Sequence, residues 1–563
     1  MIYLFLDSLI NTYKFSNKLK KKNNYKIIKY ILNCHDLIKI FIIIQCIIFN
    51  LLSLLFFFKF FNKLSKKKKL FIQNFLNKKI FSIFQTSKLL ELIYSVSTLE
   101  DNSKNYSIKK IKIKNSIINT KNLVIGSGPS GSITALELQK KNKDVLIIES
   151  GEYFSIPKIK HPFEEFLNKW RFSALSSSIG QIIQYSSGSC FGGGSEINSG
   201  LYHKPDFKFI KKIYKNISKK EFNSILNYLE KNIPYSKSIK LNKYQSKLKK
   251  LYNIGATKLN WKIENVPKLY KGSTKSSMTN TILKKYLFKN GKILLNCKAL
   301  KILKSNDHYK VEILINGKIK FIKCKNIFVT CGSPYSQNLL SRSNLRKNIN
   351  NNFHFHPMMK VIGEFNEEVN SKISQDVIPS QITEFFPKFI LGNAASGEPF
   401  IKISLFNKTN NNISFKKCSI FHATLSLGKA KIFKIPMIKD EVIYYNFSNN
   451  EKKIIKKALE KLITFVRSCG AKNIYIVDNK NTLQALNKNL NLKSYNINNL
   501  KFSSVHLLGG IDLENYGKIN NENIFVNDSS LINSHLLKNP QGTTMFIAKY
   551  NIDKIIKNKF SNF

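Results

Sequence analysis

The stretch NLVIGSGPSGSITALELQKKNKDVLIIESG, residues 122–151, decides the fold. It predicts an apolar strand, a glycine turn, a helix over 132–140 and a second apolar strand that ends at Glu149. The turn glycines stand at GxGxxG spacing: Gly126, Gly128 and Gly131. In a dinucleotide site the first glycine turns the chain, the second lets the backbone approach a pyrophosphate, and the third lets the helix pack close to the strand. Glu149 is then placed to accept hydrogen bonds from ribose hydroxyls.

Three later segments add to this unit, and two of them predict strands that return to the same sheet. The stretch SSGSCFGGGSEINSG, residues 186–200, carries three consecutive glycines, which let the backbone approach a flat or phosphorylated group. Residues 326–340 predict an apolar strand, a Cys-Gly-Ser-Pro turn and a helix. Residues 523–534 predict another strand that ends at Asp528. The fingerprint alone does not decide between FAD and NAD, so these added segments carry the choice of cofactor.

The order of these segments resembles that of the glucose–methanol–choline (GMC) family of FAD-dependent oxidoreductases, over roughly residues 120–560. The motifs that carry the resemblance are, in chain order, GSGPSG with ESG, FGGGSEINSG, IFVTCGSPYSQNLL, FHFHP, VHLLGG, FVNDSS and NPQGTTM. The FGGGS and NP…TTM motifs are most similar to the branch that holds cholesterol oxidase and the long-chain alcohol oxidases. The resemblance implies FAD as the cofactor.

The fold class expected from this resemblance is α/β, α+β overall. It is a Rossmann-like FAD-binding domain built from discontinuous segments, with an inserted antiparallel-sheet substrate domain and an N-terminal helical extension. Short alternating runs between about 345 and 495 predict the antiparallel sheet. The expected divisions are 1–115 for the extension, 116–345 for the FAD-binding domain with a helical insertion at about 205–270, 346–500 for the substrate-binding domain, and 501–563 for the C-terminal part of the FAD-binding domain.

The resemblance also implies which residues surround the flavin. His506, from VHLLGG, and Asn539, which opens the last helix, would face its reactive edge as the catalytic residues. His535, four residues before Asn539, is the competing candidate for that position. Besides Gly126, Gly128, Gly131 and Glu149, the implied cofactor-binding residues are Gly193, Gly194 and Ser195 at the pyrophosphate and ribityl chain, Asn198 at the flavin, the backbone at Cys297 near the adenine, and Asp528 and Ser529 near the ribityl region.

The FAD is expected to be non-covalent, because Ser195-Glu196-Ile197 stands where the family often has a flavin-linked histidine. No metal is expected. His354 and His356 have an HxH spacing found in some metal sites, but no Cys, Asp or Glu pattern accompanies them, which favours a structural role.

The implied reaction is oxidation of the CH–OH group of an alcohol by hydride transfer to flavin N5. His506 would be the base, because imidazole has an ordinary pKa near neutrality, and Asn539 would donate a hydrogen bond to the developing alkoxide. A simpler interpretation also exists for each residue: His506 as a buried structural histidine, and Asn539 as a helix N-cap. Two other functions stay open, a flavin-dependent fatty-acid photodecarboxylase-like enzyme and a membrane-associated FAD electron-transfer component.

The substrate is expected to be a small-molecule alcohol, bulky or lipid-like. This expectation depends on four apolar residues that suggest a pocket wall: Phe385, Phe386, Phe389 and Ile390. The sequence does not distinguish oxygen, a quinone or a cytochrome as the electron acceptor.

The net charge of +58 does not predict a nucleic-acid partner. Nucleic-acid readers favour arginine for bidentate contacts. Of the 92 basic residues only four are arginine, and the lysines are spread along the whole chain, as A+T-rich codon usage would produce. Affinity for an anionic membrane surface is consistent with the same charge.

Residues 40–58 form a 19-residue uncharged run that could cross a membrane, with the lysine-rich stretch after it as a cytoplasmic anchor. Gln45, Asn50 and Ser53 interrupt the run, so a helix packed on the protein or lying in the membrane interface fits equally well. The eight cysteines form no CxxC pair, which favours a reducing compartment. The expected location is therefore cytoplasmic or membrane-associated.

Overall fold

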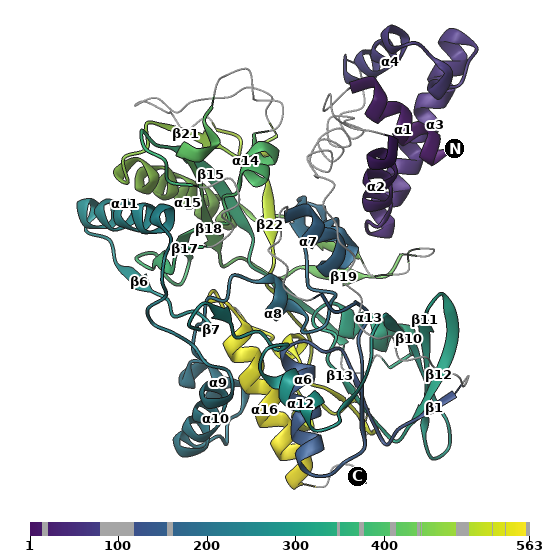
Figure 1. The fold of residues 1–563 in the computed structure, drawn as a ribbon, viewed down its shortest axis with the longest axis vertical. Coiled ribbons are helices and arrows are strands. Elements are labelled where there is room, and N and C mark those ends of the chain that lie inside the picture. The colour runs from purple at the N-terminus through teal and green to yellow at the C-terminus, as the bar shows by residue number, and fades with distance from the viewer. Residues whose placement is uncertain are drawn as a thin grey trace.

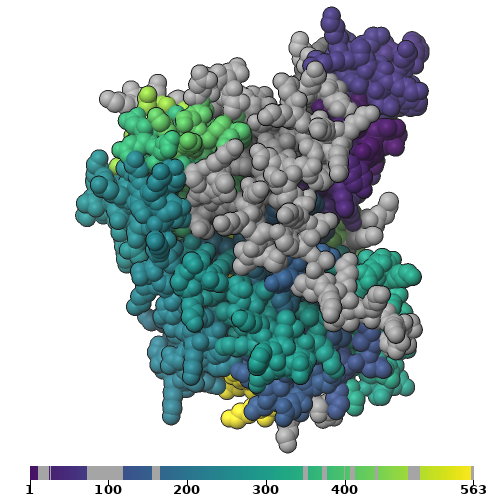
Figure 2. Space-filling model, in the orientation of Figure 1, coloured from purple at the N-terminus to yellow at the C-terminus, as the bar shows by residue number. Residues whose placement is uncertain are grey.

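The structure is a computed structural model of the 563-residue chain, and Figure 1 shows its fold. It describes residues 1–13, 21–78, 117–154, 162–345, 349–370, 377–405, 413–435, 438, 440, 442–479, 495–520, 522–534 and 536–558. Two layered regions share a cavity, and a group of helices from the N-terminus lies at one end (Figures 1 and 2).

The nucleotide-binding region is built around a parallel sheet, as the fingerprint predicts. Its strands run in the order β24-β13-β2-β3-β9, and every pairing in it is parallel. Four of the strands, β2, β3, β13 and β24, are buried along their whole length, as expected for a sheet covered on both faces, and the edge strand β9 begins at the exposed Lys292. The strands are β2 (Asn122–Ile125), β3 (Val145–Ile148), β9 (Lys292–Leu294), β13 (Asn326–Val329) and β24 (Ile524–Val526).

Helices and a small antiparallel sheet cover this parallel sheet. Helix α6 starts directly after β2, and the last helix, α16, packs along it (Figure 1). The helices are α6 (Pro129–Lys140), α12 (Ile282–Phe288), α13 (Tyr335–Arg342) and α16 (Gln541–Lys557). The second sheet, in the order β1-β12-β11-β10, consists of β1 (Ile117–Asn119), β10 (Cys297–Lys304), β11 (Tyr309–Ile315) and β12 (Lys318–Cys324).

A mostly antiparallel sheet forms the other region, in the order β5-β22-β15-β18-β17-β16-β6, with β21 paired to β15. Its bounds are β5 (Ile183–Tyr185), β6 (Ile263–Asn265), β15 (Met358–Glu364), β16 (Ser380–Ile382), β17 (Phe389–Asn393), β18 (Cys418–Leu425), β21 (Asn473–Ile476) and β22 (Phe502–Ser504). One face packs on α11 (Lys243–Leu259) and α15 (Asn449–Ser468), and α14 (Glu398–Ser404) contacts β18. Since β5, β6 and β22 come from outside 346–500, the two regions are interleaved along the chain.

The remaining elements connect these regions. They are α7 (Pro162–Lys169), α8 (Gly194–Ile197), α9 (Phe207–Ile213), α10 (Lys219–Asn232), the pair β14 (Ile349–Phe355) and β23 (Leu507–Ile511), the group β4 (Ile179–Gly180), β19 (Lys431–Phe433) and β20 (Val442–Tyr445), and the hairpin β7 (Tyr270–Lys271) and β8 (Thr274–Lys275). The predicted helical insertion at about 205–270 corresponds to α9, α10 and α11.

The N-terminal helices form their own apolar cluster: α1 (Ile2–Tyr13), α2 (Lys21–Leu32), α3 (Asp36–Phe57) and α4 (Lys66–Lys78). They also touch the body. The Tyr30 hydroxyl donates to the Ser173 carbonyl at 2.8 Å, and the His35 backbone N–H donates to the Leu175 carbonyl at 3.0 Å. Phe172, Ser173 and Ala174 all have positive φ, an uncommon conformation that these contacts help to hold.

Helix α3 is 22 residues long and its most apolar window has a mean hydropathy of 2.7, enough by length and composition to cross a membrane. One face packs on the other N-terminal helices and holds the polar residues Gln45, Asn50 and Ser53. The opposite face is apolar and exposed, with Leu51 60% and Leu55 69% exposed.

Candidate active site

A cavity of about 1720 Å³ lies where the two regions meet. Its walls come from distant parts of the chain: the loop after β2, the second glycine stretch, the turn after β13, β15, β17 and β18, the segment after β22, and the start of α16. Its volume exceeds the 300–1,000 Å³ usual for a small-molecule pocket. The space is therefore large enough for a dinucleotide together with a substrate.

The two glycine stretches meet backbone to backbone at this cavity. A Cβ atom at Gly193, whose φ is +56°, would lie 2.7 Å from the Gly128 Cα. A Cβ at Gly131 would lie 1.9 Å from the Gly126 carbonyl oxygen, so only glycine lets α6 pack this close to its strand. The N-terminus of α6, with its free N–H groups and positive dipole end, therefore opens on the cavity, as pyrophosphate binding requires.

Glu149 is buried at the end of β3 and lines the cavity. One carboxylate oxygen accepts from the Ser127 N–H at 2.9 Å and the Ser127 hydroxyl at 2.8 Å; the other accepts from the Gly151 N–H at 3.0 Å and the Ser150 hydroxyl at 3.1 Å. Since the two hydroxyls can rotate, ribose hydroxyls could replace them while the backbone bonds stay.

Asp528 closes the opposite side of the nucleotide-binding region. It accepts hydrogen bonds from the Gly332 N–H at 2.8 Å, the Ser336 hydroxyl at 2.6 Å and the Ser530 N–H at 2.8 Å. Burial nevertheless raises its pKa above the ordinary value. The neighbouring Ser529 hydroxyl accepts from the Ser333 N–H at 3.3 Å. These bonds join the turn after β13 to the turn after β24.

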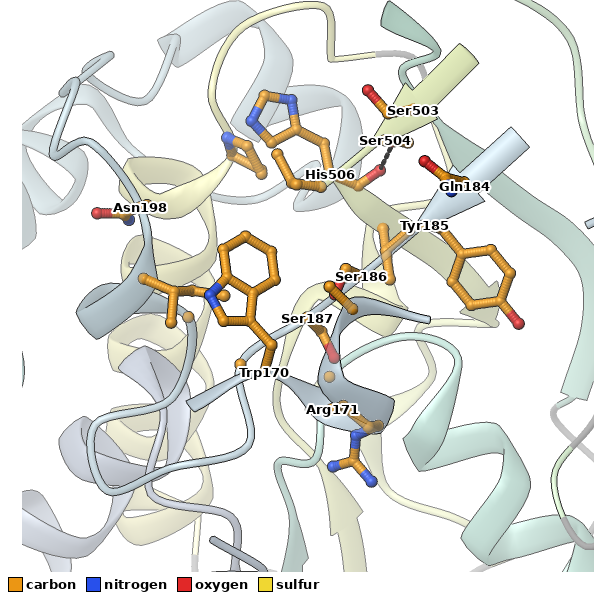
Figure 3. A pocket seen from close by; sticks show the side chains of 18 of the residues that line it. Trp170, Arg171, Gln184, Tyr185, Ser186, Ser187, Asn198, Ser503, Ser504 and His506 are labelled. Atoms are coloured by element: carbon orange, nitrogen blue, oxygen red, sulfur yellow. Dashed lines mark hydrogen bonds between the residues drawn. The ribbon is translucent and has the colours of Figure 1, made fainter. Parts of the chain in front are cut away.

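His506 and His356 form a ring pair, and Figure 3 shows His506 among the residues that line the cavity, which include Trp170 and Asn198. The two Nδ1 atoms lie 3.2 Å apart and the rings meet edge to face, with centroids 5.3 Å apart. His356 is fully buried, and burial lowers the pKa of His506 to about 4. His506 is therefore neutral at pH 7. For a hydrogen bond between the two rings, one Nδ1 must carry a proton and donate, and the other Nδ1 must accept.

Asn539 lies next to a third histidine. Its backbone N–H donates to His203 Nδ1 at 3.3 Å, and His203 Nε2 lies 3.1 Å from Gln381 Oε1, which fixes the neutral tautomer with the proton on Nε2. Burial lowers the pKa of His203 to about 4. The N-cap position of α16 is Pro540, and no side-chain capping bond forms there. The Asn539 side chain lines the cavity instead.

Asn198 is tied to the last helix. Its side-chain amide donates to Gln541 Oε1, and its Oδ1 accepts from the Gly200 N–H at 3.0 Å. Lys275 Nζ donates to the carbonyls of Glu196 and Asn198, and burial lowers the pKa of Lys275 to about 8. The second glycine stretch is thus held on both sides.

The walls of the cavity suit FAD. Gly194 has no atom within 4 Å of the place where a Cβ would be, so its backbone stays open to a ligand. Trp170 Nε1, Ser186 Oγ and the Asn338 amide are buried polar atoms without a hydrogen-bond partner among the described residues, and all three side chains line the cavity. Buried polar atoms are normally satisfied, so a polar ligand is the expected partner.

The structure brings together nearly all of the residues predicted from the sequence. The following line the cavity: Gly126, Gly128, Glu149, Gly193, Gly194, Asn198, Cys297, His506, Asp528, Ser529 and Asn539. Gly131 and Ser195 lie behind its wall; the Ser195 hydroxyl donates to the Gly192 carbonyl at 2.7 Å and accepts from the Met278 N–H at 2.9 Å. His535 lies outside the described residues.

The predicted apolar wall is largely wrong. Of its four residues only Ile390 lines the cavity. Phe385 packs on Trp261 and Phe389, and Phe386 is exposed. Phe385 and Phe389 belong to the packing between the sheet and α15, which the sequence could not separate from a pocket because phenylalanine is abundant throughout the chain.

Sequence reasoning also missed polar residues of the cavity: Trp170, Lys275, Lys360 and His422. His356 had been identified only as part of an HxH motif, without its partner. No local pattern marks these positions, because each is defined by strands and loops from elsewhere in the chain.

Comparison with known proteins agrees with this site. Residues 120–358 match the family model for GMC oxidoreductases. Among curated proteins, a GMC-type oxidoreductase of unknown role from Sinorhizobium fredii is 23% identical over 471 residues, which cover 76% of this chain and 92% of that protein. Long-chain-alcohol oxidase FAO3 of Arabidopsis thaliana is 26% identical over 287 residues, and FAO4A is 22% identical over 428; the chain spans only 38% and 57% of their lengths.

Solved structures show the same fold. Pyridoxine 4-oxidase from Mesorbium loti superposes with a TM-score of 0.61 at 14% identity and covers 78% of this chain and 99% of its own. A formate oxidase variant from Aspergillus oryzae gives 0.59 at 11% identity, with 78% and 98% covered. The fold and the site define a flavin-dependent oxidoreductase. Residues 120–358 match the GMC oxidoreductases, as the sequence motifs indicated, and the chain has the fold of the FAD-containing structures in that comparison.

Proposed function

We propose that this enzyme oxidises the CH–OH group of an alcohol, with His506 as the base. The observation that carries the proposal is the neutral His506 ring at the cavity wall, with its Nδ1 engaged by His356 and its Nε2 without a hydrogen-bond partner among the described residues. A base must be unprotonated and within reach of its substrate. Relatives named as alcohol oxidases support the same reaction class.

The chain's own residues divide the task of holding the alcohol. His506 Nε2 accepts the hydroxyl proton, which requires that its Nδ1 carry a proton and donate to His356 Nδ1. The Asn539 amide donates a hydrogen bond to the substrate oxygen as negative charge develops. Its backbone is fixed by His203, so the amide is positioned before the substrate arrives. When bound, FAD supplies the acceptor for the hydride that leaves carbon.

FAD would be held without a covalent bond. The N-terminus of α6 and Gly193–Gly194 would take the pyrophosphate, Glu149 the adenosine ribose, and Asp528 with Ser529 the ribityl region. Two histidines line the cavity in the described part of the chain. His506 is assigned to the base, and His422 lies on the substrate-side sheet, so neither is assigned to a bond with the flavin. Acid precipitation should therefore release FAD into the supernatant.

The test is anaerobic flavin reduction in the dark. His506→Ala should keep the visible spectrum of bound flavin. With any accepted alcohol its rate of flavin reduction should be about 10²–10⁴-fold lower than that of wild type, which is the usual contribution of general base catalysis. His308→Ala, outside the cavity on the turn between β10 and β11, is the matched control and should behave as wild type. An unchanged rate in His506→Ala would remove the base role. Turnover of a fatty acid that needs light would support photodecarboxylation instead.

We also propose that the N-terminal helices rest on an anionic membrane surface instead of crossing the bilayer. Helix α3 keeps its polar residues on the packed face and presents an apolar face, while Lys66, Lys67 and Lys68 at the start of α4 are exposed beside it. An apolar stripe flanked by lysines binds in the interface plane. We also propose that residues 346–500 form the main part of the substrate-binding domain.

A further inference from the structure

The cavity-facing side of the antiparallel sheet carries one positively charged residue, Lys360. Strands β17, β18 and β15 lie side by side (Figure 1), and alternate residues point to the cavity: Met358, Lys360, Ile390, Ile420, His422 and Thr424. The intervening residues, such as Met359, Val361 and Ala423, belong to the core on the other face. Lys360 and His422 are direct cross-strand partners. They form a polar pair beside the apolar residues Met358, Ile390 and Ile420.

Lys360 carries a charge that nothing in the described structure balances. Its ammonium group makes no hydrogen bond or ion pair with a described residue, and burial alone lowers its pKa. The acidic residues on the cavity wall belong to other segments: Glu149, Glu165, Glu196, Asp440 and Asp528. Asp440 is already paired with Arg342 at 3.3 Å. Lys360 is half-buried in the cavity wall, where a charge without a partner is poorly solvated, so a ligand anion would be favoured at this position.

His422 is held beside Lys360 as a neutral ring. Its Nδ1 lies 3.1 Å from the Thr424 hydroxyl, and a Cβ at Gly392, its neighbour on β17, would lie 2.8 Å from its Nε2. Glycine at 392 therefore makes room for the ring. Burial and the Lys360 charge lower the pKa of His422 to about 3. The ring also bonds the Asn393 backbone, so His422 packs beside Lys360 without adding a second charge.

The pair lies some distance from the reacting hydroxyl. Met358 pairs with Ser503, three residues before His506, and β15 runs antiparallel to β22, so Lys360 is about 7 Å further along on the side away from His506. We propose that Lys360, with His422, binds the anionic group, a carboxylate or a phosphate, of an alcohol whose hydroxyl lies against His506 and Asn539. Several atoms separate the two groups of this substrate. The inference rests on the proposed alcohol oxidation and names its substrate class.

The experiment uses the full-length flavoprotein and matched alcohols. Flavin reduction is measured with 4-(hydroxymethyl)benzoate, its methyl ester, and 4-(hydroxymethyl)phenyl phosphate. The charged alcohols should give the higher kcat/KM, and Lys360→Met should lower it about 10–100-fold for them, the usual effect of losing a charged hydrogen bond, but less than threefold for the ester. Lys310→Met, an exposed lysine on β11, removes the same charge outside the cavity and should have no effect.

A binding measurement separates this inference from the proposed function. Benzoate and phenyl phosphate, which cannot be oxidised, are titrated while the flavin absorbance is followed, and Lys360→Met should weaken the tighter of the two about 10–100-fold. If benzoate binds more tightly, the anionic group of the substrate is a carboxylate; if phenyl phosphate binds more tightly, it is a phosphate. Equal effects of Lys360→Met on the ester and the charged alcohols, or unchanged anion binding, would overturn the inference. Failure of every alcohol to reduce the flavin, with anion binding intact, would overturn only the proposed function.

Discussion

The acid side of the pH profile should be set by the residue His506. Its pKa is lowered to about 4, because the imidazolium form would lose hydration in the cavity. The neutral form is the base, so activity is present above this pKa and is lost as the pH falls through it. We expect kcat/KM to stay level from pH 8 to about 5 and to fall below about 4. A stopped-flow pH profile measures this, and a fall centred at pH 6–7 would contradict it.

His356 is a positioning residue for His506, because it contacts the catalytic ring and is itself fully buried. His356→Ala should lower kcat/KM about 10–100-fold, part of the 10²–10⁴ that a general base contributes, since Nδ1 of His506 loses its acceptor. His356→Asn, whose amide oxygen can accept the same proton, should recover much of this loss. The acid limb of the pH profile should also move in His356→Ala, which a purely structural role would not cause. Flavin content and unfolding midpoint serve as controls.

At the scale of elements, the two glycine stretches act as one unit. Helix α6 and α8 both start at the cavity, and their loops touch through Gly128 and Gly193. The Ser127 hydroxyl accepts from the Gly192 N–H at 3.1 Å and donates to Glu149. The fingerprint therefore depends for its shape on a segment about 65 residues later, which its glycine spacing alone does not indicate.

Two glycine substitutions should separate folding from cofactor binding. Gly131→Ala places a methyl group 1.9 Å from a backbone oxygen and should destabilise the protein by at least about 3 kcal/mol and abolish FAD binding. Gly194→Ala meets no protein atom within 4 Å, so stability should change by less than about 1 kcal/mol. Because its methyl group enters the cavity, FAD affinity should fall about tenfold or more.

Denaturant unfolding and flavin fluorescence report the two effects. Equal stability of Gly131→Ala and wild type would mean that α6 packs differently from the structure. Full FAD affinity in Gly194→Ala would mean that the cofactor does not approach the second glycine stretch.

At the scale of the whole molecule, the N-terminal helices extend the protein at one end (Figure 2). They reach the cavity through Tyr30, which is one of its lining residues. The proposed membrane surface predicts that the full chain co-sediments with vesicles containing anionic lipid and much less with neutral vesicles. Leu51→Asp with Leu55→Asp, on the exposed face of α3, should reduce this binding by about 2 kcal/mol or more, because two buried apolar side chains are lost.

The control for this measurement is Leu314→Asp, a partly exposed leucine on β11 away from the N-terminal helices, which should bind vesicles like wild type. High-salt extraction distinguishes a surface helix from a span. Retention of the protein in the membrane after salt and alkaline washing would show that α3 crosses the bilayer.

The sequence by itself determined the strand, glycine turn, helix and strand of residues 122–149, and the resemblance of its motifs pointed to His506 and Asn539, which line the cavity. The first of these features is local: its parts follow one another within about 30 residues, so spacing alone reports their geometry. Only the tertiary structure decided that His356 contacts His506, that three phenylalanines lie away from the cavity, and that Lys360 faces it beside His422. Those facts depend on which strands pair and which face each strand turns inward, and a one-residue shift in register would reverse them.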